Sequence, residues 1–282
     1  MESKENQRNY DIIDVHTHTY PPAIAERATE SLGRFYDFPV KGKGTYDDLE
    51  SVSVTCGVKG FLLFSVATNA HQVEKVNNNT AALAELSRSH GFETVGFAGM
   101  HQDFPDYEAE LDRCLEMGLR GVKIHPDIQR MDLLSDETYR LCELLEKKGM
   151  PVLFHMGDDR PEYRYSEPKK LKTLLQSFPR LQVIAAHLGG YRAWEEAREW
   201  LYGTPNVWYD CSSALWAMTP EDAAGLMADC GWDRVLFGTD YPVVHPAEYI
   251  QLFMRVPMTE QQRRDIFYGN VHRFFAENNI SL

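Results

Sequence analysis

Short apolar runs alternate with longer amphipathic segments along almost the whole chain. Eight of the apolar runs have the length of strands, at 11–16, 59–66, 94–100, 120–125, 151–155, 182–187, 206–211 and 234–239. Several of them, such as Phe61-Leu62-Leu63-Phe64 and Val183-Ile184-Ala185-Ala186, stay apolar over consecutive positions. Uninterrupted runs of this kind are typical of parallel strands that are buried on both faces.

Segments with helical spacing of apolar residues separate these runs. They cover 71–90, 105–117, 135–148, 167–178, 191–202, 219–230, 246–254, 259–268 and 270–279. The segment 135–148 begins at Ser135 and ends in Lys147-Lys148-Gly149, a basic last turn followed by a glycine. Eight strands with helical crossovers in 282 residues predict an α/β fold, a single (β/α)8 TIM barrel with its active site at the C-terminal ends of the strands.

An open, doubly wound sheet is the alternative architecture. Neither a GxGxxG motif nor a Walker-type glycine loop supports it. No internal repeat or linker divides the chain, so we predict one domain over 1–282. Residues 20–48, which include Pro21-Pro22 and Lys41-Gly42-Lys43-Gly44, form a longer excursion after the first strand, where it can cover the barrel mouth.

Polar side chains close several of the predicted strands. His16 and His18 end the first strand, and their two-residue step places both imidazoles on one face of an extended chain. His155, His187 and Asp240 each follow an apolar run in the same way. One such residue alone is more often a satisfied buried group or a helix cap. Four strand ends of this kind predict a site, because all strand ends of a barrel open on the same face.

The residue types indicate a metal site. Imidazole and carboxylate suit zinc, and also manganese, iron and cobalt. A divalent metal lowers the pKa of bound water to about 7, and a neighbouring carboxylate can then move the proton. Asp240 is therefore a candidate ligand and proton shuttle. Lys123 and His125 share a face of the fourth strand; Lys123 is expected to hydrogen-bond substrate or, when carbamylated, to bridge two metals.

Composition and charge limit the classes of molecule that the protein is expected to bind. The formal net charge of −13 argues against nucleic acid or an anionic membrane as the main partner. The first ten residues lack the apolar stretch of a signal peptide, and no apolar run approaches a membrane span. Five scattered cysteines without CxxC spacing are typical of reduced thiols. We expect a cytoplasmic protein with a small-molecule substrate, and leave a homodimer open.

Together the motifs resemble the amidohydrolase superfamily, especially the amidohydrolase-related (amidohydrolase 2) branch of metal-dependent hydrolases and decarboxylases. The resemblance spans nearly the whole chain and rests on 14–18, 121–126, 151–155, 186–190, 237–242 and the closing segment 265–275. It implies that His16, His18, His155 and Asp240 hold one divalent metal, with zinc as the first expectation. It also implies that His187 polarises the substrate or, with carbamylated Lys123, binds a second ion.

The leading hypothesis from the sequence is a metal-dependent hydrolase. Metal-activated water would attack a C–N or C–O acyl bond of a small molecule, with Asp240 moving protons and His187 or Lys123 stabilising the oxyanion. The alternative is non-oxidative decarboxylation of a small unsaturated or aromatic carboxylic acid, in which Asp240 delivers a proton to carbon. A non-catalytic barrel is a third hypothesis, which the complete ligand set disfavours.

Overall fold

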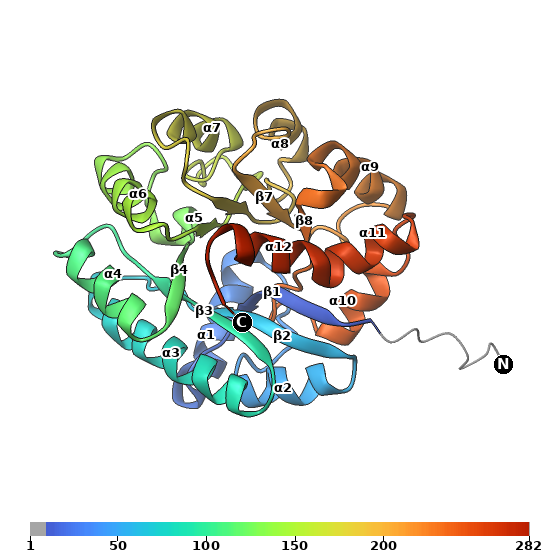
Figure 1. Ribbon diagram of the computed structural model, residues 1–282, viewed down its shortest axis with the longest axis horizontal. Coiled ribbons are helices and arrows are strands. Elements are labelled where there is room, and N and C mark those ends of the chain that lie inside the picture. The colour runs from blue at the N-terminus through green and yellow to red at the C-terminus, as the bar shows by residue number, and fades with distance from the viewer. Residues whose placement is uncertain (1–9, 282) are drawn as a thin grey trace.

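The computed structural model describes residues 10–281, and its strands form one parallel sheet in the order β1 to β8 (Figure 1). Each of the eight predicted apolar runs overlaps one strand, which confirms the predicted barrel. The strands are β1 (Ile12–His18), β2 (Val58–Phe64), β3 (Glu93–Gly99), β4 (Leu119–Ile124), β5 (Val152–Phe154), β6 (Val183–Ala185), β7 (Val207–Asp210) and β8 (Val235–Leu236).

Helices cover the outside of the sheet, and all nine predicted helical segments are found. They correspond to α3 (Val73–Ser89), α4 (Tyr107–Glu116), α6 (Asp136–Lys148), α7 (Pro168–Ser177), α8 (Trp194–Trp200), α9 (Pro220–Cys230), α10 (Pro246–Phe253), α11 (Glu260–Arg264) and α12 (Asn270–Glu277), with a π-helix at Asp265–Gly269. None of the helices between residues 10 and 281 combines the length and apolar character that crossing a bilayer requires.

Three helices were not predicted: α1 (Pro22–Tyr36), α2 (Tyr46–Val54) and the single turn α5 (Pro126–Gln129). Helix α1 lies within the predicted excursion at 20–48. Its Pro22 stands in the first turn, where proline is tolerated because that N–H has no helical partner. Only Ala25 of α1 is fully buried, so this amphipathic helix contributes little to the core.

Backbone hydrogen bonds join the last strand to the first and close the barrel. Val15 N–H donates to the carbonyl of Phe237 (2.9 Å), and His18 N–H donates to the carbonyl of Tyr241 (2.8 Å). Thr17 and Tyr241 also form a parallel bridge. The chain beyond β8 therefore runs alongside the carboxyl end of β1.

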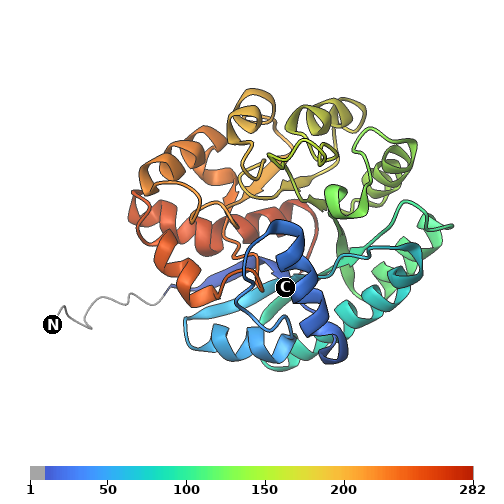
Figure 2. The same ribbon diagram turned by 180° about the vertical axis from the view of Figure 1, so that it is seen from behind.

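The inward side chains of the strands form an apolar core within the barrel. The cluster contains alternating positions of the strands, and also Val271, Phe274 and Phe275 of α12. Helix α12 lies across one end of the barrel in Figure 1, and α1 lies over the other end in Figure 2. The amino end of the barrel is thus filled with apolar side chains, and the opposite end remains available for a site.

An irregularity in β1 decides where its histidines point. Ile13 and Val15 belong to the inner core, so simple alternation would direct His16 and His18 outward. The register between β1 and β2 shifts between Asp14 and Thr17, which inserts one extra residue. His18 is consequently paired with Phe64, an inner-core residue, and both imidazoles contact the ring of Phe64. The bulge brings both histidines to the inside of the barrel.

Candidate active site

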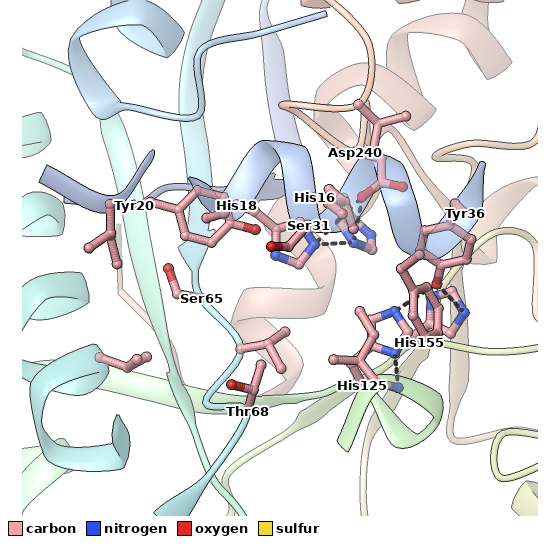
Figure 3. A pocket seen from close by; sticks show the side chains of 18 of the residues that line it. His16, His18, Tyr20, Ser31, Tyr36, Ser65, Thr68, His125, His155 and Asp240 are labelled. Atoms are coloured by element: carbon pink, nitrogen blue, oxygen red, sulfur yellow. Dashed lines mark hydrogen bonds and ion pairs between the residues drawn. The ribbon is translucent and has the colours of Figure 1, made fainter. Parts of the chain in front are cut away.

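Three of the predicted metal ligands converge at the carboxyl end of the barrel. His16 Nε2 lies 3.3 Å from His18 Nε2 and 3.3 Å from Asp240 Oδ1, and His18 Nε2 lies 3.6 Å from Asp240 Oδ1 (Figure 3). With bonds of about 2.1 Å, two ligands of a tetrahedral ion are about 3.4 Å apart. The three donor atoms therefore have the spacing that one small divalent ion requires.

Asp240 is held by the loop that follows β8. Its backbone N–H donates to the carbonyl of His16 (3.0 Å), and its φ of 65° turns the chain back over β1. Ser213 Oγ donates to Asp240 Oδ2 (2.6 Å), which leaves Oδ1 directed at the histidines. A Cβ at Gly238 would approach Cβ of His16 to 2.9 Å, so this loop can lie against β1 only with glycine there.

A buried carboxylate fixes the orientation of the His16 ring. His16 Nδ1 donates to Oδ2 of Asp210 (2.9 Å), and neither side chain reaches solvent. Burial opposes ionisation of Asp210, but its electrostatic interaction and its hydrogen bond with His16 outweigh this effect and hold its pKa well below its usual range. With a proton on Nδ1, the lone pair of His16 Nε2 faces the site. Carboxylates orient metal-binding histidines in this way.

Asp210 was not predicted from the sequence, although the same rule could have found it. It is the last residue of β7, within the predicted strand core 206–211, and it has the same strand-end position as His155. Ser212 Oγ donates to Asp210 Oδ1 (2.5 Å) and lies 2.9 Å from Nδ1 of His187. Ser212 thus joins the His16 and His187 imidazoles to one buried carboxylate.

His187 and His155 form a second layer of imidazoles. Donor atoms of His187, His16 and Asp240 all lie within 4.8 Å of one another. His155 Nδ1 lies 2.9 Å from His187 Nε2, and the His155 ring stacks on His125 at 3.8 Å. His155 groups with His125 and Asp127 rather than with the first three ligands. The role of His155 as the fourth ligand stays a prediction. His187 lies between His155 on one side and His16 and Asp240 on the other.

Burial keeps four of the imidazoles, those of His16, His18, His125 and His155, uncharged at neutral pH. Burial, together with the positive charge of Lys123, lowers the pKa of His16 to about 4. Burial likewise lowers the pKa of His18, His125 and His155. Neutral imidazole is the form that binds a metal. The donor set therefore fits a divalent metal in protonation state as well as in spacing.

Lys123 lies beneath this cluster. Its Nζ is 3.3 Å from His16 Nε2 and 5.1 Å from the centre of the Phe64 ring, and the side chain is fully buried. Burial lowers the pKa of Lys123 to about 8, which increases the fraction of uncharged amine, the form that reacts with carbon dioxide. Lys123 does not line the cavity above the cluster. Carbamylation and a direct substrate contact both stay predictions.

Tyr36 is a site residue that the sequence gave no signal for, because α1 itself was not predicted. Its hydroxyl lies 2.8 Å from His125 Nε2 and 3.3 Å from His155 Nε2. Arg160 holds this end of α1: its guanidinium donates to the carbonyl of Phe35 and stacks on the rings of Phe35 and Tyr36. The last turn of α1 is thereby attached to the histidine cluster (Figure 3).

A cavity of about 590 Å³ lies above the cluster. Its inner end is polar, with the histidines and Asp240, and α1 supplies much of its wall. Many of the side chains between the inner end and solvent are apolar or aromatic: Ile24, Leu32, Phe35, Tyr36, Phe38, Val66, Ile128, Tyr191 and Val243. Such a cavity suits a small, flat, largely apolar molecule that carries a polar group at one end.

Comparison with known proteins shows the family. The family model described as Amidohydrolase (Amidohydro_2) matches residues 13–276. A relative from Polaromonas sp. (strain JS666), a gamma-resorcylate decarboxylase, is 23% identical over 272 residues, and the match covers 76% of this chain and 82% of the relative.

Solved structures have the same fold. A 2,6-dihydroxybenzoate decarboxylase complexed with 2,6-dihydroxybenzoate has a TM-score of 0.72 at 17% identity, covering 95% of this chain and 99% of the other. A dihydroxybenzoic acid decarboxylase from Polaromonas sp. JS666, with bound manganese and the inhibitor 2-nitroresorcinol, has a TM-score of 0.69 at 17% identity, covering 95% and 98%. The match of the family model over nearly the whole chain establishes that this protein belongs to the amidohydrolase family, within its amidohydrolase 2 branch.

Proposed function

We propose that this enzyme is a metal-dependent, non-oxidative decarboxylase of a small aromatic carboxylic acid that carries a ring hydroxyl. The observation that carries the proposal is the cavity: aromatic and apolar walls lead to a single cluster of imidazoles and one carboxylate. The 23% identical relative is named as a decarboxylase of a resorcylate, which is an acid of this class. This relative supports the decarboxylase, which was the alternative hypothesis from the sequence, rather than the hydrolase, which was the leading one.

The metal would be held by His16, His18 and Asp240, with His155 and His187 as the adjacent candidates for further ligation. When bound, it would act as a Lewis acid on the carboxylate or hydroxyl oxygens of the substrate. One of the structural neighbours contains manganese. The ligand set suits manganese and zinc alike, so we propose a single divalent ion of either kind.

The walls of the cavity would orient the ring and exclude water. Aromatic side chains such as Phe35 and Tyr191 offer faces and edges against which a substrate ring can stack. The histidines and Asp240 lie at the inner end, so the reacting carboxylate of an aromatic acid would point at them. This arrangement would bring the carbon that bears the carboxylate close to Asp240.

Asp240 would supply the proton that replaces carbon dioxide. Burial opposes its ionisation, but its electrostatic interactions with His16, His18 and His187 and the hydrogen bond from His18 hold its pKa well below its usual range. A substrate carboxylate beside it adds a like charge, which favours retention of one proton between the two groups. Protonation of the ring carbon by Asp240 then allows the C–C bond to break. Its electron pair restores the aromatic ring, and carbon dioxide leaves.

The first prediction concerns the products. Metal-loaded protein incubated with hydroxybenzoic acids in ²H₂O should release one carbon dioxide per turnover and place one deuterium on the carbon that lost the carboxylate. Gas measurement and mass spectrometry of the ring product check both points. Inertness toward these acids, together with cleavage of amides, esters or lactones by the same preparation, would instead establish the hydrolase.

The second prediction concerns Asp240. Asp240→Asn should fold normally and lower kcat by roughly 10²- to 10⁴-fold, the usual contribution of a positioned proton donor. The measurement is steady-state turnover at equal metal content, because Asp240 is also a proposed ligand. Asp103→Asn is the matched control, since its side chain is 74% exposed and does not line the cavity. Near-normal turnover of metal-loaded Asp240→Asn would remove the proton shuttle.

The third prediction concerns the buried carboxylate that orients His16. Asp210→Asn should weaken metal binding by about 10- to 100-fold, because the amide removes the charge that fixes the tautomer of His16. Competition against a chromogenic chelator measures the affinity, and circular dichroism checks the fold. Asp11→Asn, an exposed change just before β1, should leave the affinity unchanged. Equal affinities for Asp210→Asn and the unmodified protein would show that Asp210 does not support the metal.

A further inference from the structure

The outer part of the cavity lies between two helix faces. From α1 come Ile24, Arg27, Ala28, Ser31 and Phe35, at helical spacing of three and four residues. From α3 and the turn before it come Gln72, Lys75, Val76 and Asn79, with the same spacing. Ser65 and Thr68 lie on the side of the cavity away from His155 (Figure 3). The cavity therefore continues past the cluster into a polar region built by α1 and α3.

Three polar side chains of this region have no partner among residues 10–281. Within residues 10–281, the side chains of Arg27, Lys75 and Asn79 make no hydrogen bond, and neither cation has an ion pair. Arg27 and Lys75 are exposed although both line the cavity, which places them where it opens to solvent. Both cations are thus available to a molecule in the cavity.

The charges along the cavity are separated. Asp240 is the acidic residue among its lining residues, and it belongs to the inner end; Arg27 and Lys75 are the cations, and they lie at the opening. The chain as a whole has a formal charge of −13. Two unpaired cations at the mouth of an acidic protein create a local field that attracts anions.

The size of the cavity agrees with a second contact point. Pockets that enclose drug-sized ligands measure roughly 300–1,000 Å³. At about 590 Å³, this cavity has room beyond a single substituted ring seated at the inner cluster.

We propose that Arg27, Lys75 and Asn79 form an outer subsite for a second anionic group of the substrate. The proposal rests on the decarboxylase function proposed above and narrows it. The substrate would be an aromatic acid with two anionic ends. One carboxylate reacts at the inner cluster, and the other anionic group remains at the mouth, held by a guanidinium, an ammonium and a carboxamide.

A binding experiment with paired ligands tests this subsite. The probes are hydroxybenzoates that carry, opposite the reacting carboxylate, a chain of zero to four methylenes ending in a carboxylate or in the uncharged carboxamide. Calorimetry with the metal-loaded protein should give at least one chain length at which the carboxylate binds roughly three- to tenfold more tightly, as expected for two partly exposed ion pairs. The preference should shrink in high salt.

Variants assign the preference to the two cations. The double variant Arg27→Gln/Lys75→Gln should bind carboxylate and carboxamide equally. The control Arg34→Gln/Lys59→Gln makes the same change in net charge at exposed positions that do not line the cavity, and it should keep the preference. A phosphonate at the chain end tests whether the subsite distinguishes phosphate-like groups from carboxylates; binding no weaker than that of the carboxylate supports an anion subsite of broad selectivity.

Two outcomes would overturn the subsite. In the first, the unmodified protein binds the carboxylate and the carboxamide of every pair equally well. In the second, the double variant Arg27→Gln/Lys75→Gln keeps the preference for the carboxylate. Because the readout is binding, its failure is separate from that of the proposed reaction. If the protein prefers the carboxylate but releases no carbon dioxide, the subsite is supported and the decarboxylase is refuted. If it releases carbon dioxide but shows no preference, the decarboxylase is supported and the subsite is refuted.

Discussion

The hydrogen bond between His16 Nδ1 and the buried carboxylate of Asp210 is the interaction on which the site depends. It joins β1 to β7, the two strands on either side of β8, and it leaves Nε2 of His16 directed at His18 and Asp240. The bond is available only because the extra residue in β1 brings His16 inside. Without that bulge, a strand with Ile13 and Val15 in the inner core would direct its histidines to the outer helices.

Helix α1 connects the chemistry to the shape of the cavity. Its final turn contacts His125 and His155 through Tyr36, and its middle turns form a wall and part of the opening. The helix contributes little to the core, since Ala25 is its one fully buried residue. Its sequence is therefore free to vary with the ligand, which makes α1 the element through which this barrel would select a substrate.

The fold followed from the sequence because buried parallel strands have a strong signature. Each of the eight apolar runs became a strand, and the strand-end rule located His16, His18 and Asp240 together. The same rule would have found Asp210. The sequence did not predict which imidazole lies next to which. His187 adopts a φ of 60° after β6 and so lies between His155 and His16. Helix α1 and Tyr36 were missed for a different reason. Pro21-Pro22 and Lys41-Gly42-Lys43-Gly44 suggested an irregular excursion, although the apolar residues between them recur at helical spacing.

A crystal structure of the metal-loaded protein, with anomalous diffraction recorded at the absorption edges of manganese and zinc, tests the central claim most directly. The account predicts one strong anomalous peak about 2.0–2.3 Å from His16 Nε2, His18 Nε2 and an oxygen of Asp240, with Asp210 still bonded to Nδ1 of His16. A peak elsewhere, or full metal binding with any of these three side chains turned away from the ion, would contradict it.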